Sequence, residues 1–354
     1  TEFGNPSSSH WYGIRPKRAV EKARQQVAGL LNCQAEEVFF TSGGTESNNH
    51  AIKGMARALK GKGRHIITST VEHPAVLEVC EYLKNEGFQT TCVDVDDTGM
   101  VRMETVAAAI RPDTILITIM HANNEVGTIQ PISEIVALAK EKEICIHTDA
   151  AQSVGKIPTD VQAMDVDLLS MAGHKVYAPK GIGVLYVKKG LLPEKLCHGA
   201  GQETGWRAGT ENVLAIVGLG KACEMAERSI DYAGQHLKAM RDRLHKGLEE
   251  QMKDIRLNGH PENRLPNTLS LSFKGLVANR ILEEIGLEVA ASAGAACHSD
   301  TMILSHVLEA MRVPVEWAKG TVRFSTGRMT TSEQIDRAVS VVDIAVKRLR
   351  MEGQ

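Results

Sequence analysis

Ile144-Cys-Ile-His-Thr-Asp-Ala-Ala-Gln152 begins with a short apolar run that stops at an acid, and Leu168-Leu-Ser-Met-Ala-Gly-His-Lys175 is a second run that leads to a lysine. Both runs are apolar almost throughout, which is typical of parallel strands buried on both faces. In α/β folds, ligands bind outside the carboxyl ends of such strands. The two segments therefore predict an α/β fold in which Asp149 and Lys175 lie at the edge of a parallel sheet.

Short β-branched runs alternate with helical stretches from Ile14 to about Val187, which is the pattern of successive βαβ units. The expected strands are Val38–Thr41, His65–Thr70, Thr114–Met120, Ile144–Thr148, Leu168–Met171 and Val184–Val187. The expected helices include Arg18–Leu31, Val76–Glu86 and Ser133–Lys142. This part of the chain is predicted to form a large domain with a mostly parallel sheet.

A long helical region follows this alternating part. Val213–Gln251 has no proline and few glycines, which favours one or two long helices of the kind that bridge domains. We place the domain boundary near Arg228. A large domain then covers residues 1–228, with its first residues packing against the smaller domain, and a small α+β domain covers residues 229–354.

The small domain is expected to contain a sheet and a terminal helix. Thr268–Phe273 and Thr321–Ser325 alternate apolar and polar residues, which is typical of strands with one exposed face. Thr331-x-x-Gln334 is a capping box, and apolar residues follow it at helical spacing. We therefore expect a half-exposed sheet and a helix that starts at Thr331.

The composition of the 354-residue chain excludes several classes of protein. A formal net charge of -2 without a basic stripe argues against a nucleic-acid or anionic-lipid partner, and no apolar run is long enough to cross a bilayer. The seven cysteines include no C-x-x-C pair, which argues against a disulfide framework and a structural zinc site. We expect a cytoplasmic protein with a small-molecule partner. Because the sequence opens at Thr1 without an initiating methionine, we also expect it to start within a longer gene product.

Lys175 and Asp149 have the residue types that a carbonyl cofactor requires. A lysine fixed just after a strand can form a Schiff base, although most lysines at such positions are only solvated. An acid at the end of a buried strand needs a cationic partner, which a protonated pyridine nitrogen supplies; a helix N-cap is the alternative. Gln152 follows, where its amide can donate to a ring oxygen or cap the local backbone.

Three further loops follow predicted strands. Thr41-Ser-Gly-Gly-Thr-Glu-Ser47 combines free N–H groups with hydroxyls, which makes a phosphate cradle before a helix and a plain connector elsewhere. His73 can stack on a cofactor ring and move protons, although a lone histidine is usually structural. Asn123-Asn-Glu125 places an amide where it can bond a phenolic oxygen, or it forms a simple turn.

A separate segment supplies a candidate nucleophile. Ala291-Ser-Ala-Gly-Ala-Ala-Cys-His-Ser-Asp300 consists largely of small residues that favour neither helix nor strand, so Cys297 is expected on a mobile, accessible loop. The other six cysteines lie in apolar, periodic contexts that are typical of buried thiols. His298 is adjacent in sequence and its side chain should point away, so we infer no Cys–His dyad. Arg323 can bind a substrate carboxylate through two bonds, or it pairs at the surface.

Taken together, these motifs resemble the NifS/IscS-type cysteine desulfurases, which have the aminotransferase-like fold of pyridoxal 5'-phosphate enzymes. The resemblance runs nearly from end to end. It covers Gly4-Asn-Pro-Ser-Ser8, Thr41-Ser-Gly-Gly-Thr-Glu-Ser-Asn48, Glu72-His-Pro74, Asn123-Asn-Glu125, His147-Thr-Asp-Ala-Ala-Gln152, Gly173-His-Lys175, Arg207-Ala-Gly-Thr210, the segment around Cys297, and Arg323-Phe-Ser-Thr-Gly-Arg328.

The resemblance implies a cofactor site for pyridoxal 5'-phosphate. Lys175 is implied to be the Schiff-base lysine and Asp149 to pair with the ring nitrogen. His73 is implied to stack on the ring and to take part in catalysis. Asn124 and Gln152 are implied to flank the ring oxygen, and Asn124 also to contact the substrate.

The resemblance also assigns the cofactor phosphate. Gly44, Thr45 and His174 are implied to bind it, and Thr210 is implied to reach the phosphate of the neighbouring subunit in a homodimer. Ala172 stands where the family usually has a hydroxyl residue, so one phosphate hydrogen bond is expected to be lost. Such a bond is worth about 1 kcal/mol, which lowers cofactor affinity without abolishing it.

The implied reaction converts L-cysteine to L-alanine. Arg323 is implied to hold the substrate carboxylate, and the Cys297 thiolate is implied to attack the substrate sulfur and to carry it as a persulfide. The sulfur then passes to an acceptor protein of an iron–sulfur cluster, tRNA or DNA sulfur pathway. No metal takes part.

Alternatives share parts of this interpretation. The wording around Cys297 is also similar to selenocysteine lyases, so L-selenocysteine is an alternative substrate, and a small-molecule aminotransferase would use the same cofactor residues. A non-catalytic binding protein of the same fold and a nucleotide-binding module are alternatives from another class, although no G-x-G-x-x-G or Walker pattern supports the latter. A metal site at Cys145, His147 and Asp149 is disfavoured because it requires a fourth ligand from a distant segment.

Overall fold

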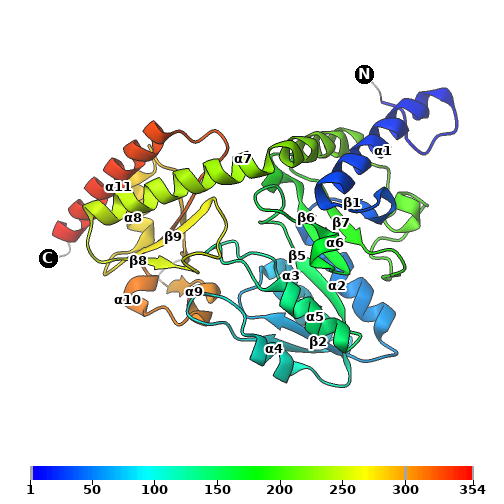
Figure 1. Cartoon of the computed structure of the whole chain (residues 1–354), viewed down its shortest axis with the longest axis horizontal. Coiled ribbons are helices and arrows are strands. Elements are labelled where there is room, and N and C mark those ends of the chain that lie inside the picture. The colour runs from blue at the N-terminus through cyan, green and yellow to red at the C-terminus, as the bar shows by residue number, and fades with distance from the viewer. Residues whose placement is uncertain (1–2, 299–300, 353–354) are drawn as a thin grey trace. The chain divides into compact units, whose positions relative to one another are not determined.

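Two main sheets organise the chain, one of seven strands and one of four, and each belongs to a separate unit (Figure 1). The computed structural model describes residues 3–298 and 301–352. Within these ranges, no helix combines the length and the apolar character that crossing a membrane requires.

The two units are not simple halves of the sequence. The second unit takes the residues from Asp231 onward together with two earlier segments, Asp94–Arg102 and Ala122–Ile129. The rest of the chain, up to Ile230, forms the first unit. The two earlier segments were not part of the predicted division near Arg228, and that boundary stays a prediction.

The seven-stranded sheet has the order β1-β7-β6-β5-β4-β2-β3. Its strands are β1 (Val38–Thr41), β2 (His65–Ser69), β3 (Gln89–Val93), β4 (Thr114–Thr118), β5 (Cys145–Asp149), β6 (Leu168–Ala172) and β7 (Gly183–Val187). All neighbours pair in parallel except β7, which is antiparallel to both β1 and β6. The carboxyl ends of the other six strands therefore lie at one edge, and the predicted α/β class with a mostly parallel sheet is confirmed.

Burial explains which strands the sequence predicts. Strands β1, β2 and β4 to β7 are buried along their whole length, so their sequences are short apolar runs at close to the predicted bounds. Strand β3 was not predicted. It is an edge strand in which only Val93 is buried, so Gln89, Thr90 and Thr91 give it no apolar pattern.

Helices α1 to α6 belong to the first unit, and the long helix α7 continues from it into the second. They are α1 (Trp11–Leu31), α2 (Gly44–Leu59), α3 (Pro74–Lys84), α4 (Met103–Ala109), α5 (Ile132–Glu141), α6 (Val161–Met164) and α7 (Val213–Gln251). Helix α1 begins at Trp11 rather than at the predicted Arg18, because Pro16 lies inside the helix without ending it. Proline removes one backbone donor there, and the buried Pro16 ring contributes packing instead.

Helix α2 fixes the geometry of the predicted ligand edge. It packs across strands β4 to β7. Its residues Ile52 and Met55 join Ile66, Leu116 and Leu185 of the sheet in one buried apolar cluster. Each side chain of this kind contributes about 1.5–3 kcal/mol on burial, so the position of α2 on the sheet is well determined.

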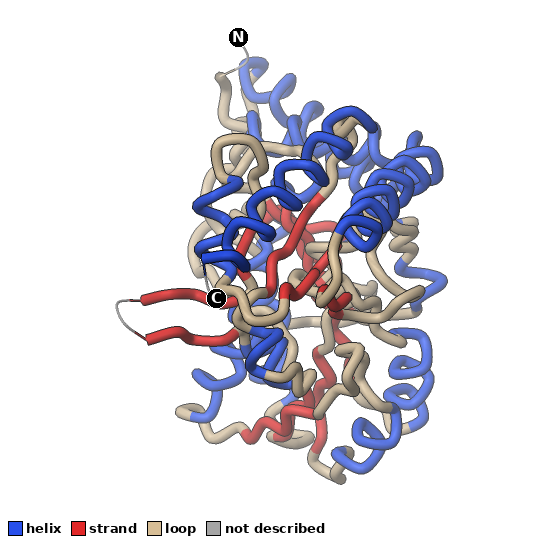
Figure 2. Tube along the Cα trace, turned by 90° about the vertical axis from the view of Figure 1, so that its left-hand side faces the viewer, coloured by secondary structure: helices blue, strands red, loops and turns tan. Residues whose placement is uncertain are grey.

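The second unit contains a four-stranded antiparallel sheet of order β10-β13-β9-β8. These strands are β8 (Ile255–Asn258), β9 (Thr268–Phe273), β10 (Ser292–Ala293) and β13 (Thr321–Ser325). Strands β11 (Ala295–His298) and β12 (Thr301–Leu304) pair antiparallel to each other and form a separate two-stranded sheet (Figure 2). The remaining helices are α8 (Ala278–Ile285), α9 (His306–Ala310), α10 (Val315–Ala318) and α11 (Ser332–Glu352).

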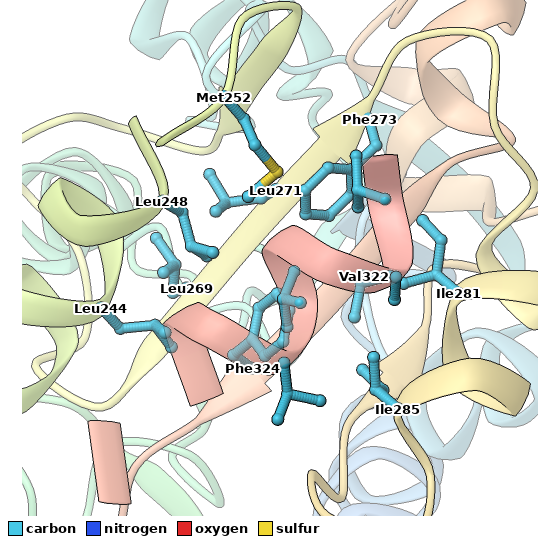
Figure 3. Packing of buried hydrophobic residues seen from close by; sticks show 14 of the residues in the cluster. Leu244, Leu248, Met252, Leu269, Leu271, Phe273, Ile281, Ile285, Val322 and Phe324 are labelled. Carbon is cyan, nitrogen blue, oxygen red and sulfur yellow. The ribbon is translucent and has the colours of Figure 1, made fainter. Parts of the chain in front are cut away.

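An apolar core forms between this sheet and the helices of the second unit (Figure 3). Leu248 of α7 and Ile281 of α8 lie in it with Leu271, Phe273 and Val322 from the sheet. The predicted long helix over Val213–Gln251 is thus a single element, whose C-terminal part covers this sheet.

The expectation of a half-exposed sheet is wrong for β9. All six residues of β9 are buried, and the strand lies between β8 and β13 in the sheet. The polar residues of the alternation bond to each other: the Asn258 amide donates to the Ser272 hydroxyl at 2.8 Å, and Ser272 and Thr321 hydroxyls lie 2.7 Å apart. The alternating polar residues therefore form a face on which polar side chains bond to each other, and polar groups that are hydrogen-bonded can be buried.

The predicted capping box at the start of α11 is confirmed. The backbone N–H of Gln334 donates to the Thr331 hydroxyl at 3.3 Å, and the backbone N–H of Thr331 donates to the Gln334 side chain at 3.1 Å. We expect Thr331→Ala to lower the free energy of unfolding by about 1 kcal/mol, because an orphan donor of the first turn loses its partner. Urea denaturation measures this. Ser340→Ala, which removes a hydroxyl from an exposed interior position of α11, serves as the control, and equal losses in both variants would contradict the prediction.

Candidate active site

The predicted cofactor residues of the first unit gather at one edge of the seven-stranded sheet. The loops after β1, β2, β5 and β6 leave the sheet at this edge, because these strands run in the same direction. The structure places there Gly44 and Thr45 after β1, His73 after β2, Asp149 and Gln152 at the end of β5, and His174 and Lys175 after β6.

Asp149 is the buried acid of this edge, with only 7% of its surface exposed. Its Oδ1 accepts from the backbone N–H of Ala151 at 2.9 Å, and its Oδ2 accepts from the Asn48 amide at 2.7 Å. Burial raises the pKa of Asp149, and the two hydrogen bonds oppose this rise. A carboxylate held in such surroundings is stabilised by a cation, which agrees with the predicted pairing to a protonated ring nitrogen.

The loop after β1 has the geometry of an anion cradle. Helix α2 begins at Gly44, so the backbone N–H groups of Gly44 and Thr45 have no acceptor within the helix. The positive end of the helix dipole adds to their attraction for a phosphate. A Cβ at Gly44 would come within 3.2 Å of the Ala172 Cβ, so the backbone approaches the end of β6 closely. The donors of this loop fit a phosphate group.

Lys175 and its neighbour lie on a short 3-10 helix, Gly173–Val176, which directly follows β6. Both Lys175 and His174 are exposed. Burial and then the charge of Lys175 lower the pKa of His174. The amine of Lys175 is thus accessible at a fixed point of the sheet edge, as covalent attachment of a cofactor requires.

Lys156 is a functional candidate that the sequence did not reveal. Its Nζ donates to the backbone carbonyl of Gln152 at 2.7 Å and lies 3.4 Å from the Gln152 side-chain oxygen. Burial, and then the charge of Lys175, lower the pKa of Lys156 to about 7. The contact turns the oxygen of the Gln152 amide toward Lys156, which leaves its NH₂ group available to donate elsewhere.

His73 and Glu72 form the end of the β2 loop. His73 is the N-cap of α3: its Nδ1 accepts from the backbone N–H of Ala75 at 3.0 Å, so the ring proton of a neutral His73 lies on Nε2. Glu72 is fully buried and accepts from the Ser69 hydroxyl at 2.6 Å and from the backbone N–H of Met120 at 2.9 Å. Burial raises the pKa of Glu72 to about 8.

Two arginine–glutamate pairs join the segment before Thr210 to the anion cradle. Glu203 accepts from both Nη atoms of Arg24 at 2.8 Å and from the backbone N–H of Phe40 at 2.9 Å, next to the end of β1. Arg207 donates from Nε to Glu46 in the first turn of α2 at 2.8 Å. Thr210 itself is exposed.

The remaining predicted residues belong to the second unit. Arg323 of β13 donates to the backbone carbonyl of Asn124 at 2.8 Å and to the Ser292 hydroxyl at 3.1 Å. Its Nε is buried and has no partner in the described part of the chain. The guanidinium therefore keeps capacity for a further acceptor, as a carboxylate-binding role requires.

Cys297 lies on a strand and not on the irregular loop that its sequence suggests. The backbone of β11 pairs with β12, with Cys297 opposite Met302. Backbone pairing in a hairpin explains this correction, because small residues form strands when a partner strand satisfies their N–H and C=O groups. The side chain of Cys297 lies outside the described part of the structure.

The structure thus adds residues to those found by sequence. Asn48 and Glu72 lie inside recognised motifs, but their buried bonds to Asp149 and Met120 join segments far apart in the chain. Arg24 and Glu203 are separated by 179 positions. No local pattern in the sequence signals such pairs.

Comparison with known proteins gives the family. The aminotransferase class-V family matches residues 1–338. The chain is 48% identical over 350 residues to cysteine desulfurase IscS of Dictyoglomus turgidum, which covers 99% of this chain and 89% of that protein. It is 49% identical over 349 residues to cysteine desulfurase IscS of Methanosarcina thermophila, which covers 98% and 86%.

Solved structures agree with these sequences. A NifS-like protein superposes with a TM-score of 0.92 at 38% identity, covering 98% of this chain and 92% of that chain. A NifS-like protein from Rickettsia africae gives a TM-score of 0.86 at 29% identity and covers 97% and 92%. SspA in complex with cysteine gives a TM-score of 0.80 at 37% identity and covers 93% and 92%.

The fold and the lysine at the sheet edge define a class-V aminotransferase, and the chain belongs to that family. Within the family it belongs with the cysteine desulfurases of the IscS and NifS type. The predicted enzyme class and activity are therefore confirmed. Enzymes of this class depend on pyridoxal 5'-phosphate.

The buried Glu72 makes stability depend on pH. Its pKa is about 8 in the folded protein against 4.5 as the reference value, so the folded state keeps a proton that the unfolded state releases. The contribution of Glu72 to the free energy of unfolding therefore falls as pH rises between these two values, by up to about 1.4 kcal/mol per pH unit. We expect Glu72→Gln to flatten the dependence. Urea denaturation at several pH values measures it.

Glu78→Gln is the matched control for this measurement, because Glu78 is exposed on the neighbouring helix α3. This variant should keep the wild-type dependence on pH. A Glu72→Gln protein with the same slope as the wild type between pH 5 and pH 8 would show that Glu72 is already ionised in the folded state.

Proposed function

We propose that pyridoxal 5'-phosphate binds at the carboxyl edge of the seven-stranded sheet and is held covalently by Lys175. The observation that carries this proposal is the presence of three complementary groups at that edge: the buried Asp149 carboxylate, the helix N-terminus at Gly44 and the exposed Lys175 amine. They match the three ends of the cofactor, which are a basic ring nitrogen, a phosphate and an aldehyde.

The other residues of the first unit take roles around these three. Thr45 and His174 bind the phosphate with Gly44, and His73 stacks on the ring with its exposed imidazole. Gln152 donates its amide to the ring oxygen, which its contact with Lys156 supports. These roles rest on family membership together with the geometry of each side chain.

Substrate binding and sulfur transfer are assigned to Arg323, Asn124 and Cys297. Arg323 holds the substrate carboxylate with the donor that its contacts leave unused. Asn124 contacts the cofactor oxygen and the substrate, and Cys297 accepts the sulfur; for these two residues the proposal rests on family membership.

The protein groups then perform the steps of the reaction. When bound, the cofactor withdraws electrons from the α-carbon of the substrate. Lys175, released from its covalent bond, moves the α-proton, and His73 shuttles a proton nearby. The Cys297 thiolate attacks the substrate sulfur, so a sulfur–sulfur bond forms as the carbon–sulfur bond breaks. Protonation of the carbon that loses sulfur gives L-alanine, and Cys297 keeps the sulfur as a persulfide.

We extend the proposal to the partners and the compartment. Thr210 is exposed. Its hydroxyl is therefore accessible to the cofactor phosphate of a second subunit in a homodimer. L-cysteine is the substrate, and an acceptor protein removes the sulfur for an iron–sulfur cluster, tRNA or DNA sulfur pathway. The six cysteines with described side chains are free thiols, which supports a reducing cytoplasm.

The covalent role of Lys175 is tested on the purified protein loaded with pyridoxal 5'-phosphate. Borohydride reduction fixes the cofactor, and peptide mass analysis locates it. We expect the label on Lys175 and none in Lys175→Ala. A label on Lys156 instead, or a protein that binds no cofactor, would overturn the proposed function.

The role of Cys297 is tested by its alanine variant. Cys297→Ala should retain the cofactor and lose the release of alanine and sulfur from cysteine by about a hundredfold or more, because the nucleophile is absent in the transition state. Cys92→Ala, which removes an exposed cysteine from the edge strand β3, is the control and should keep wild-type rates. A Cys297→Ala enzyme with full sulfur release would contradict the assignment.

A further inference from the structure

Asn48 makes a buried contact with the candidate cofactor site that the proposed roles do not use. It lies on the sheet-facing side of α2 with 1% of its surface exposed. Its Nδ2 donates to Oδ2 of Asp149 at 2.7 Å, across 101 positions of sequence. The contact joins the helix that carries the anion cradle to the acid that faces the ring nitrogen.

The direction of this hydrogen bond is set by chemistry. An ionised carboxylate only accepts, so the Asn48 amide must present its NH₂ group to Asp149. The backbone N–H of Ala151 occupies the other oxygen, Oδ1, at 2.9 Å. Each oxygen thus has one donor and keeps further acceptor capacity for a third, incoming N–H group.

The other end of the Asn48 amide has no partner. Its Oδ1 is buried and accepts no hydrogen bond in the described part of the chain. A buried amide that is only half satisfied costs free energy, and an apolar residue of similar size would avoid this cost. The bond to Asp149 is the only one that the Asn48 side-chain amide makes in the described part of the chain. We therefore look for the role of Asn48 in its effect on Asp149.

The charges around Asp149 explain why a neutral donor is needed. Burial raises the pKa of Asp149, and the charge of Asp149 adds to the burial that raises the pKa of Glu72. The bonds from Ala151 and Asn48 lower the pKa of Asp149, and His73 lowers it further. Among these groups, Asn48 is the side chain that stabilises the ionised form by direct hydrogen bonding.

We propose that Asn48 is a positioning residue that keeps Asp149 ionised and correctly oriented, so that the cofactor ring nitrogen is bound in its protonated form. This inference rests on the proposed function and deepens it. Asn48 does not touch the reacting atoms. It acts through Asp149, and its loss should change the state of the ring nitrogen before it changes the fold.

Two variants separate the donor from its size and charge. Asn48→Leu removes the donor without adding charge, and Asn48→Asp keeps the shape and can share one proton with Asp149, so that the pair keeps a hydrogen bond and a single negative charge. Asn32→Asp is the matched control, because the Asn32 amide donates to the Asp160 carboxylate at 2.8 Å in the same way but at an exposed position. The same chemical change is thereby made away from the site.

The experiment loads each protein with pyridoxal 5'-phosphate carrying ¹⁵N in the ring and records its nitrogen NMR signal, with cofactor affinity measured by titration. We expect a protonated ring nitrogen in the wild type and in Asn32→Asp. Asn48→Leu should shift the signal toward the unprotonated form, and Asn48→Asp should leave the ring nitrogen protonated, because its carboxyl group can share a proton with Asp149. Asn48→Leu should also bind the cofactor about tenfold or more weakly, the usual effect of losing a hydrogen bond to a charged group.

Each outcome decides the matter. An Asn48→Leu protein that binds the cofactor with an unchanged ring-nitrogen signal would overturn the proposal, as would an equal shift in Asn32→Asp. If Asn48→Asp does not fold, the signal of Asn48→Leu decides, and a failure of both to fold would assign Asn48 a structural role instead. A wild-type protein that takes up no cofactor is a separate result, which would overturn the proposed function itself.

Discussion

A carboxylate buried at the end of β5 is the constraint on which the rest of the site depends. Asp149 cannot remain charged there without compensation, because transfer of an ion from water to a protein interior costs several kcal/mol even after relaxation. The chain supplies two donors, from Ala151 and Asn48, and these oppose the effect of burial. In the proposed function, a protonated ring nitrogen supplies further stabilising charge to Asp149.

The architecture brings this acid, an anion cradle and an amine to one place with few elements. Parallel strands end at the same sheet edge, and α2 lies across three of them, β4 to β6, and across the antiparallel strand β7. The same helix therefore offers its N-terminus to a phosphate and its buried side chain Asn48 to Asp149. The pairs of Glu203 with Arg24 and of Arg207 with Glu46 then attach the segment that leads to Thr210 to this loop. The distances between the acid, the anion cradle and the amine are thus set by packed secondary structure.

Local features of this arrangement could be predicted from sequence, and long-range pairings could not. Asp149 and Lys175 follow apolar runs, so their position at a sheet edge follows from strand periodicity alone, and the capping box at Thr331 is equally local. The bond between Asn48 and Asp149 has no local pattern, because tertiary packing brings its two ends together. Alternation in β9 misled for a related reason: whether a polar face is exposed depends on its neighbours, here Asn258 and Thr321.

The pKa shifts of three groups in the loops at this edge all favour the neutral form, which affects how a charged ligand binds. Burial lowers the pKa of Lys156 to about 7 and that of His174 below its usual value, while it raises the pKa of Glu72 to about 8. Each of these three shifts favours the neutral form of its group. In the proposed function, the cofactor phosphate would favour protonated His174, and the ring proton would favour ionised Asp149. Cofactor binding and protonation are therefore coupled at this edge. The buried donors around Asp149 favour its ionised form, and an ionised Asp149 favours a proton on the ring nitrogen.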